Sequence, residues 1–564
     1  MRFIPLCLMF SLASALYAQA QLQQFTPGSS DYPQAPTFPQ KSWIRQHFES
    51  PLPRMELKPP TRLGDFVVGS TIELSLKNYL ELVLANNTDI QIQKLSIETQ
   101  RNAILRAFAP FDPFVITGFR STRVENPAND VLAGAATLNQ LSQPFNLSYN
   151  QTLETGTSYT VGYNATKTST NSAFANFNPA INSNLNLSFT QPLLRGRGTG
   201  NQRLGILIAK TRFRGVQYNL SDQLMRLLQQ AELAYWAVIE ARESLRVQEE
   251  ALKLFDTLLK RSERELQLGA ISPLEIYQPQ QQYANQEVVV IQARYRLQQA
   301  EDTMRRQMGA DLDPQYRSML ITLTETVLPP SDEQTFDKEM IVESALQRRP
   351  DLKASIQNIE VDDLTIKQTR NNLLPDLALT GTYGSAGRGG TFYQRQNVFG
   401  GDGSQSQIVN VIPGGFGDAL SQMWGFGLPT YGFGLNLRLP IRDRRASADL
   451  ADATVSRRLN MLRARNTEQT VRLEVLNAIT QVENSRASVK QSQIALDFSQ
   501  KRVEAEQKRY DLGVTTIFFV INAQNDLVRA QADLVQQSVQ YRRNLLNLLR
   551  TTGQLLDERG VVID

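Results

Sequence analysis

The fold is decided by residues 220–245, which read LSDQLMRLLQQAELAYWAVIEARESL. Apolar or small side chains recur there at alternating spacings of four and three residues, and the stripe continues to Leu266. An average step of about 3.5 residues predicts helices that coil left-handedly around their neighbours. Because the pattern extends from about 204 to 268, we expect one helix roughly 100 Å long at 1.5 Å per residue. An ordinary globular bundle would explain the periodicity but not this length.

A second stripe with the same alternating spacing runs from Val471 to Tyr510. Pairs of identical residues also occur in the same order around the two stripes. The matched pairs are Asp89 with Asp351, Pro113 with Pro375, Pro192 with Pro440, Gly269 with Gly513 and Gly309 with Gly553. Matches in this order along the chain predict that one structural unit occurs twice.

The expected organisation has six segments. These are a signal peptide at 1–20, a Pro-rich N-terminal extension at 21–70, repeat 1 at 71–310, a linker at 311–337, repeat 2 at 338–553 and a C-terminal tail at 554–564. Each repeat holds a leading helix, barrel strands (113–192 and 376–440) and a helical hairpin (204–308 and 445–552). Gly269 and Gly513 are the expected hairpin turns, because glycine adopts a left-handed backbone most easily.

The first twenty residues are typical of a secretory signal. Arg2 provides a positive start, residues 3–16 are apolar, and Ala18-Gln19-Ala20 is a small-residue cleavage site. Cleavage would remove Cys7, the only cysteine, which fits an exported protein that uses no disulfide or thiol chemistry. Beyond this segment the longest apolar run is 517–521, far short of the ~20 residues of a helical membrane span, so any membrane insertion must use strands.

Several segments between the leading and long helices alternate apolar and polar side chains, as strands do. The six candidates lie at 114–122, 145–150, 158–164, 184–189, 377–383 and 431–438. A soluble sandwich would alternate in the same way. Export favours a lipid-facing barrel, with the Gly- and Asn-rich segments 124–144, 168–183 and 384–430 as outer loops.

Six strands are too few to close a membrane barrel, since the smallest have about eight. The number falls to four if residues 145–165 form a hairpin outside the wall. Unpaired strand edges are not tolerated in lipid, so several chains must share one barrel. The predicted class is therefore α+β, with long coiled-coil hairpins joined to the strands of a membrane β-barrel that several chains share.

Composition excludes several other functions. With 59 basic and 55 acidic side chains the formal charge is only +4, which argues against a nucleic-acid partner. One histidine, His47, and one cysteine are too few for a zinc site or for most nucleophilic catalysis. We therefore expect neither an enzyme nor a metal or cofactor. Two rivals stay open, namely a periplasmic coiled-coil scaffold or adhesin without a pore, and an exported hydrolase that uses only carboxylates.

From about residue 71 to 553 the chain resembles the TolC family of outer-membrane efflux channels. The resemblance rests on the duplicated order of elements, on Gln191-Pro192-Leu193 and Leu439-Pro440-Ile441 before the long helices, and on residues 509–513, RYDLG. It implies a homotrimer in the cell outer membrane, with a shared β-barrel and a twelve-helix periplasmic tube. The tube tips would meet a periplasmic adaptor and an inner-membrane transporter. The chain would be the passive exit duct of a tripartite efflux or type I secretion system. The family's usual barrel uses four strands per chain, against six candidates here.

The resemblance also implies a gate at the tips. Acidic residues that often ring the closed tip in the family are replaced here by Phe519 and Asn522, whereas Glu275 and Gln278 occupy the equivalent places in the first repeat. A trimer would have one ring of three carboxylates, from Glu275, which favours cations.

The family's latching arginine is replaced by Thr515, while Tyr510 is retained. We therefore expect the tip to be closed more by apolar contact around Phe518 and Phe519 than by ionic links. The alternative is that these two rings simply pack between helices.

Overall fold

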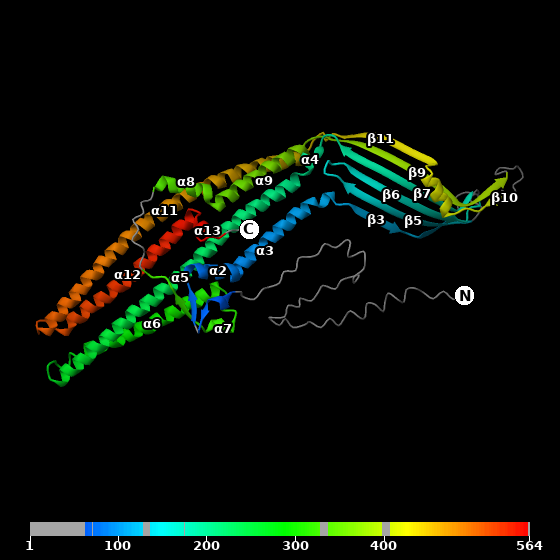
Figure 1. The fold of residues 1–564 in the computed structure, drawn as a ribbon. Helices are drawn as coiled ribbons and strands as arrows, with labels where there is room; N and C mark the ends of the chain where they lie inside the picture. Colours follow the sequence, from blue (N-terminus) through cyan, green and yellow to red (C-terminus); the bar gives the residue numbers. More distant parts are fainter. Residues whose placement is uncertain are drawn as a thin grey trace, which may run out of the picture. The chain divides into compact units, whose positions relative to one another are not determined.

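The computed structural model describes residues 62–69, 71–127, 136–173, 175–327, 337–396 and 407–561. All of them belong to the unit Arg62–Asp564. The predicted signal peptide and the extension as far as residue 61 lie outside the described part of the chain. In Figure 1 the strands of an eight-stranded sheet gather at one end of this unit, and helical hairpins run away from them to the other end.

Two very long helices dominate the unit. They are α5 (Leu204–Gln267) and α11 (Arg444–Asp511), with 64 and 68 residues, so each is roughly 100 Å long at 1.5 Å per residue. Each turns back at its end into a shorter antiparallel helix, α6 (Tyr277–Gln307) or α12 (Ile517–Thr551). The hairpins α5–α6 and α11–α12 lie side by side, with α12 packed on α5 (Figure 1).

Each leading helix is broken into two, where the sequence predicted one continuous helix. The four pieces are α2 (Leu76–Asn86), α3 (Thr88–Phe108), α8 (Lys338–Arg348) and α9 (Pro350–Asn372). In the first break the Asn87 side chain accepts hydrogen bonds from the amides of Asp89 and Ile90, which caps α3. In the second break Pro350 forces Arg349 out of the helical conformation.

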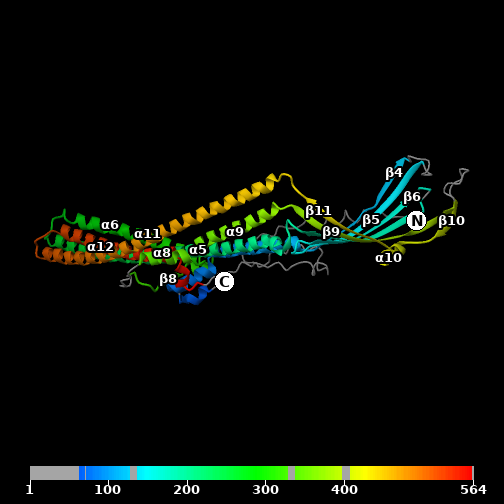
Figure 2. The same ribbon diagram turned by 90° about the horizontal axis from the view of Figure 1, so that it is seen from above.

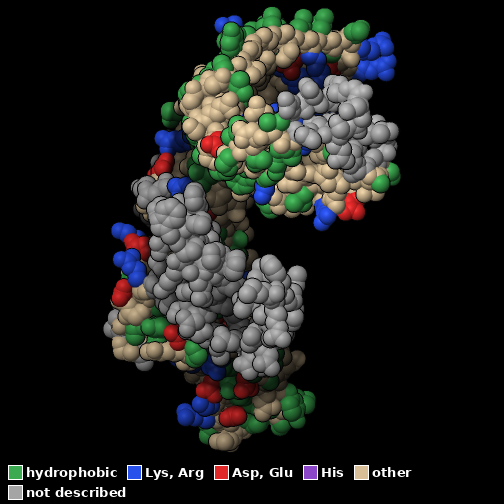
Figure 3. All heavy atoms as spheres, turned by 90° about the vertical axis from the view of Figure 1, so that its right-hand side faces the viewer, with side chains coloured by type: hydrophobic (Ala, Val, Ile, Leu, Met, Phe, Trp, Pro, Cys, Tyr) green, Lys and Arg blue, Asp and Glu red, His purple; other side chains and the backbone are tan. Residues whose placement is uncertain are grey.

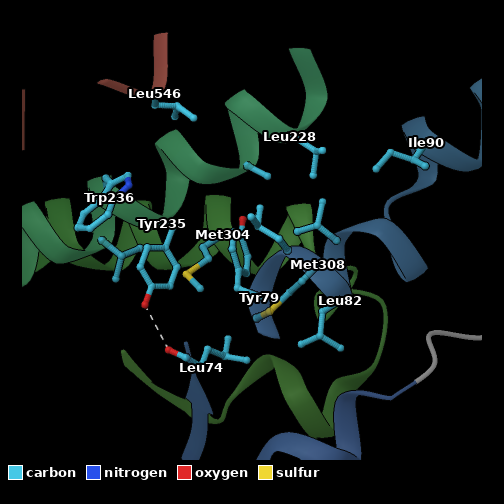
Figure 4. Packing of buried hydrophobic residues seen from close by; sticks show 14 of the residues in the cluster. Leu74, Tyr79, Leu82, Ile90, Leu228, Tyr235, Trp236, Met304, Met308 and Leu546 are labelled. Atoms are coloured by element: carbon cyan, nitrogen blue, oxygen red, sulfur yellow. Dashed lines mark hydrogen bonds between the residues drawn. The ribbon is translucent and has the colours of Figure 1, made fainter. Parts of the chain in front are cut away.

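A large core lies where α2 and a small three-stranded sheet meet α5 (Figure 4). The stripe residues Leu220, Leu224, Ala231 and Val238 are all buried in it. Tyr235 stands at its centre, stacks near Tyr79 and donates a hydrogen bond to the Leu74 carbonyl. The periodic pattern therefore marks the face of α5 that packs inward.

Two segments contribute to this core although the sequence suggested only a linker and a tail. Within 311–337, β8 (Leu320–Leu323) pairs in parallel with β2 (Thr71–Leu74), which also pairs with β1 (Val67–Val68). In the tail, Leu555 of α13 (Leu555–Glu558) is buried, and Arg559 binds both oxygens of the buried Glu232 on α5. The remaining short elements of this part are η2 (Leu63–Phe66), η3 (Ala109–Phe111), α4 (Gly198–Gln202) and α7 (Pro314–Arg317).

The large sheet is antiparallel and has eight strands in six positions. Its strands are β3 (Phe114–Phe119), β4 (Thr122–Pro127), β5 (Thr137–Thr152), β6 (Ser158–Thr170), β7 (Phe177–Pro192), β9 (Asp376–Gln396), β10 (Gln407–Ile412) and β11 (Leu428–Arg438). β3 and β4 follow one another along β5, and β11 and β10 follow one another along β9. The order of positions is therefore β3/β4, β5, β6, β7, β9, β11/β10.

Most of these strands are longer than the sequence indicated, and they extend into the predicted outer loops. β5 and β6 lie within the sheet between β3 and β7, so they are not a hairpin outside it. All six candidate segments thus belong to one sheet. The residues between β5 and β6 form a tight turn at Gly156, which has a φ of 90°.

The two faces of the sheet differ sharply in polarity. Residues paired across the strands share a face. One such row, read from β3 to β11, consists of Val115, Tyr149, Val161, Leu187, Tyr383 and Tyr431. The adjacent row on the opposite face consists of Ile116, Ser148, Gly162, Asn186, Gly384 and Thr430. We call these the apolar face and the polar face. Figure 3, viewed from the sheet end, shows hydrophobic side chains along the upper rim of the molecule.

A short helix, α10 (Phe416–Trp424), lies within the predicted loop 384–430 and packs on β9 and β7. Its inner residues Ala419 and Met423 are fully buried. A side chain at Gly387 or Gly389 of β9 would overlap the α10 backbone. The glycines of residues 387–390, GRGG, therefore provide the smooth strand surface that α10 needs.

None of the helices in the described part of the chain combines the length and the hydropathy required to cross a bilayer.

Gly387→Ala should detach α10 from the sheet, because the new Cβ would collide with the Ala419 carbonyl, and overpacking typically costs about 1–3 kcal/mol. Limited proteolysis by chymotrypsin near Trp424 should then become faster. Gly417→Ala is the matched control, since a Cβ there meets nothing within 4 Å and should strengthen the helix. Equal cleavage rates for the two variants would refute this packing.

Candidate functional site at the hairpin tips

Both hairpin turns have the same backbone geometry. Gly269 and Gly513 follow α5 and α11 with φ values of 71° and 72°. The amide of each glycine and that of the next residue bond back to helix carbonyls, at 3.0 and 2.8 Å in the first turn and 2.9 Å for both bonds in the second. This closing motif satisfies helix-end carbonyls and needs a left-handed residue, so glycine is the natural choice.

The apolar run 517–521 at the start of α12 divides between two environments. Ile517 and Ile521 are buried and pack against Phe255 and Leu258 of α5. Phe518 and Phe519 point away from this cluster, with exposed fractions of 45% and 51%, and their rings contact each other edge to face at 5.5 Å. Within one chain, therefore, these two rings do not fill the space between the hairpins.

The predicted polar positions are dispersed around the tip. Glu275 is exposed, whereas Gln278 and Asn522 are half-buried. The carboxylate of Glu275 lies close enough to Tyr510 to contribute to the raised pKa of that tyrosine. The structure thus brings Glu275 and Tyr510 into one neighbourhood. Further exposed apolar side chains surround the turns, namely Leu268, Leu274, Tyr277, Leu512 and Val514.

Four side chains join the ends of the two long helices. Arg261 of α5 binds Glu265 through Nε and Asp511 of α11 through Nη2, both at 2.9 Å. Tyr510 donates its hydroxyl hydrogen to Glu265 at 2.6 Å, and the Arg261 guanidinium lies 4.8 Å from the centre of the Tyr510 ring. We call Arg261, Glu265, Tyr510 and Asp511 the tip link.

Protonation at the tip link follows from these contacts. Burial and the hydrogen bond to Glu265 raise the pKa of Tyr510, so its hydroxyl remains a donor at neutral pH. The hydrogen bond from Arg261 lowers the pKa of the Asp511 carboxyl. Because Asp511 pairs as a carboxylate, its bond to Arg261 is complete above the ordinary aspartate pKa of about 3.9 and is lost as the pH falls through the lowered value.

The ion pair of the tip link is about half exposed, since the side chains of Arg261 and Asp511 are 40% and 50% exposed. An ion pair at such a surface contributes little to stability, and salt weakens it further. Near this link, Gln282 of α6 also donates to Asn525 of α12 at 2.9 Å. The hairpins are therefore joined at the tip by several weak polar contacts rather than by one strong one.

Sequence reasoning found Tyr510 but missed its two partners, Arg261 and Glu265. The tip residues known from the family lie after each turn glycine, whereas Arg261 and Glu265 precede Gly269. A signal was present, because Arg261 and Glu265 stand four residues apart on one helix face. Tyr510 also occupies the stripe position that matches Leu266, so both belong to the packed seam.

Comparison with known proteins relates this chain to a family of channels. Residues 341–554, from α8 to the end of α12, match the family model "Outer membrane efflux protein". The match identifies these residues, less than half of the chain, as an outer membrane efflux protein domain. The chain is an outer-membrane efflux channel, located in the cell outer membrane and serving as an exit duct. The matched family consists of channels rather than enzymes.

The efflux protein is similar to a curated relative and to several solved structures. It is 22% identical over 484 residues to outer membrane efflux protein BepC of Brucella suis, covering 85% of this chain and 91% of that protein. It shares its fold with the CmeC outer membrane channel of Campylobacter jejuni, at a TM-score of 0.58 and 16% identity, covering 85% and 86% of the two chains. For outer membrane protein VceC of Vibrio cholerae the TM-score is 0.58, the identity 13% and the coverage 85% and 96%.

Within the described part of the efflux protein, no group of three His, Cys, Asp or Glu side chains is arranged to hold a metal ion.

Breaking the tip link should let the two hairpins separate. Arg261→Gln removes both ion pairs, whereas Tyr510→Phe removes one hydrogen bond and keeps the ring beneath the guanidinium. With spin labels on cysteines at Leu268 and Leu512, pulsed electron resonance should give a longer and broader distance distribution for Arg261→Gln than for Tyr510→Phe. Lowering the pH through the depressed pKa of Asp511 should shift the parent protein in the same direction. Identical distributions in all samples would contradict the role of the link.

Proposed function

We propose that three copies of this chain close one outer-membrane channel, the exit duct of a tripartite efflux or type I secretion system. Substrates would cross it passively, delivered by an inner-membrane transporter through a periplasmic adaptor at the tips. The observation that carries the proposal is the sheet, whose six positions have a continuous apolar face and two outer edges. Among the described strands, neither edge has a further partner.

Those edges demand a neighbour if the apolar face lies in lipid. A bare N–H or C=O group in hydrocarbon costs several kcal/mol, so membrane sheets close. β11 is a hydrogen-bonding edge of 11 residues, with Tyr431 and Phe433 exposed by 76% and 80%. Pairing β11 of one copy with β3 of the next satisfies both edges. Three copies then form an eighteen-stranded barrel.

The width of such a barrel agrees with the helical part. Strands about 4.8 Å apart and tilted by about 40° give eighteen strands a diameter of roughly 36 Å, and twelve strands roughly 24 Å. Four helices from each of three copies, about 10 Å apart, form a ring of roughly 38 Å. Six strand positions per chain therefore join the tube without a constriction.

The two faces of the sheet then acquire distinct roles. The apolar face would contact lipid, and the Asn-, Ser-, Thr- and Gly-rich polar face would line a water-filled lumen. The two repeats, 71–310 and 338–553, would each supply one hairpin to every third of the tube. A wide, wet lumen offers little selectivity, so we expect substrate choice to depend on the tips and the partners.

At the tips, we assign closure to two kinds of contact. The tip link holds the hairpins of one copy together, and Phe518 and Phe519 face outward for contact with other copies near the axis. Glu275 would contribute one carboxylate from each copy. Opening would require the adaptor to replace these contacts as the hairpins move outward.

Cysteine cross-linking tests the closure between copies. The only native cysteine, Cys7, lies in the predicted signal peptide, so the background is clean. Val115→Cys on β3, combined in turn with cysteine at Tyr431, Phe433 or Leu435 on β11, should give disulfide-linked trimers for at least one pair. Val161→Cys on β6, paired with the same β11 positions, is the control and should give none.

Conductance separates the possible outcomes of that experiment. Cross-linked trimers that conduct ions in planar bilayers support the channel. Conducting trimers that never cross-link through β3 and β11 would refute the six-position wall but not the channel. A protein that fractionates with outer membranes neither as a trimer nor as a conductor would favour the scaffold or adhesin and overturn the proposal.

Phe519→Ala should raise the open probability of the purified channel in planar bilayers, because it removes half of the apolar pair at the tip. Phe498→Ala is the matched control, since Phe498 is similarly exposed on α11 but lies more than three turns before Gly513. Unchanged gating in Phe519→Ala would show that these rings do not close the tip.

A further inference from the structure

The helix α10 lies on the apolar face of the sheet, whose other side chains have no α-helix packed on them in the described part of the chain. Gly387 and Gly389 of β9 hold it, and they share their face with Leu377, Leu379 and Tyr383, because side chains alternate along a strand. The Ser385 hydroxyl, on the same face, donates to the buried Met423 carbonyl at 2.6 Å. Figures 1 and 2 show α10 at the end of the sheet away from the helices.

We propose that α10 is an interfacial helix that lies in the lipid surface of the outer leaflet and anchors the outer end of the barrel there. The inference rests on the proposed function, because it takes the apolar face of the sheet as the face in contact with lipid. Its partner is the boundary between lipid headgroups and acyl chains.

The position of α10 along the strands agrees with this boundary. From Leu377 to Gly387, β9 advances about 33 Å at 3.3 Å per residue, which is roughly 25 Å along the membrane normal at a tilt of about 40°. The apolar band of a membrane barrel is about 25 Å tall. The next row on the apolar face, at Gly389, contains Ile181, Lys167 and Gln143, so a charged side chain enters the face there. α10 therefore lies at the outer limit of the band.

The composition of α10 also fits an interface. Phe416 and Trp424 at its two ends, and Phe426 just beyond, are exposed by 49%, 57% and 49%, whereas Ala419 and Met423 face the sheet. Asp418 is the only charged residue between 413 and 428, and it accepts a hydrogen bond from the Gly415 amide. Aromatic side chains concentrate at membrane–water interfaces, where an apolar ring and a polar surrounding are both satisfied.

A neighbouring copy is a poorer partner for this surface. α10 packs on β9 and β7. Beside it, residues 387–391 of β9 pair with neither β10 nor β11, and the Arg388 amide donates to Gln422 of α10 at 2.8 Å, so α10 itself covers this stretch of the sheet edge. Its exposed aromatic side chains continue the apolar face rather than the edge. A lipid surface covers both together, whereas a second copy at the edge would leave Trp424 uncovered.

Fluorescence of Trp424 tests the inference directly. The chain has three tryptophans, and Trp43→Phe with Trp236→Phe leaves Trp424 alone. In trimers reconstituted into phosphatidylcholine vesicles, lipids brominated at acyl carbons 6 and 7 should quench Trp424 at least twofold more strongly than lipids brominated at carbons 11 and 12. Aqueous iodide should quench it weakly. If the variant fails to fold, the difference between the parent and Trp424→Phe gives the same signal.

A second probe separates this inference from the proposed function. Phe433→Trp, in a chain that also carries Trp43→Phe, Trp236→Phe and Trp424→Phe, places the probe near the middle of the apolar band and should be quenched by the deeper bromines. If this probe is quenched but Trp424 is reached by iodide, or by neither quencher, α10 contacts water or protein and the inference is wrong. If neither probe is quenched by brominated lipid, the sheet is not in the membrane and the proposed function fails as well.

Discussion

The structure depends on one constraint, that a backbone hydrogen-bonding group cannot be left bare in hydrocarbon. A sheet with one apolar face across six positions can enter a membrane only if its two outer edges find partners. Nothing in the described unit supplies them, because β3 and β11 end the order of strands. If the sheet lies in the membrane, the need for further copies follows from the sheet itself. In the proposed trimer, the diameter of the barrel matches the ring of helices below it.

The helical part solves a different problem. In the proposed channel, long hairpins must hold together over roughly 100 Å and still separate at the tip. Ala231, Val238 and their neighbours on the seam of α5 are fully buried near the small sheet, where the core is large. Toward the turns the core shrinks to a small cluster around Phe255 and Ile517, and exposed polar contacts replace it. The packing that holds the hairpins together thus decreases toward the tip, the end that moves in the proposed channel.

Much of this architecture was predictable because the spacing of apolar residues along the sequence is periodic. The alternating steps of four and three along α5 and α11 gave their length within a residue or two, and apolar–polar alternation located all six strand positions. The breaks at Asn87 and Arg349 were missed, since a capping side chain and a pre-proline residue interrupt a helix without disturbing its apolar stripe. The full length of β9 and the helix α10 were missed because glycine-rich sequence resembles a loop unless the packed partner is known.

The site was less predictable than the fold. Gly269 and Gly513 could be placed from their spacing, and Tyr510 from the resemblance. The partners of Tyr510 could not, because Arg261 and Glu265 lie on another helix and reach it only through tertiary packing. Contacts between copies are still harder to predict from sequence, because an exposed side chain such as Phe519 would find its partners only in the proposed assembly.

Counting the strands is the most direct test of the account. An electron cryomicroscopy reconstruction of the purified protein in lipid nanodiscs should show a threefold barrel of eighteen strands, in which β11 of each copy is hydrogen-bonded to β3 of the next. A threefold barrel of twelve strands, with β5 and β6 outside the wall, would contradict it. So would a particle in which the sheet edges remain unpaired.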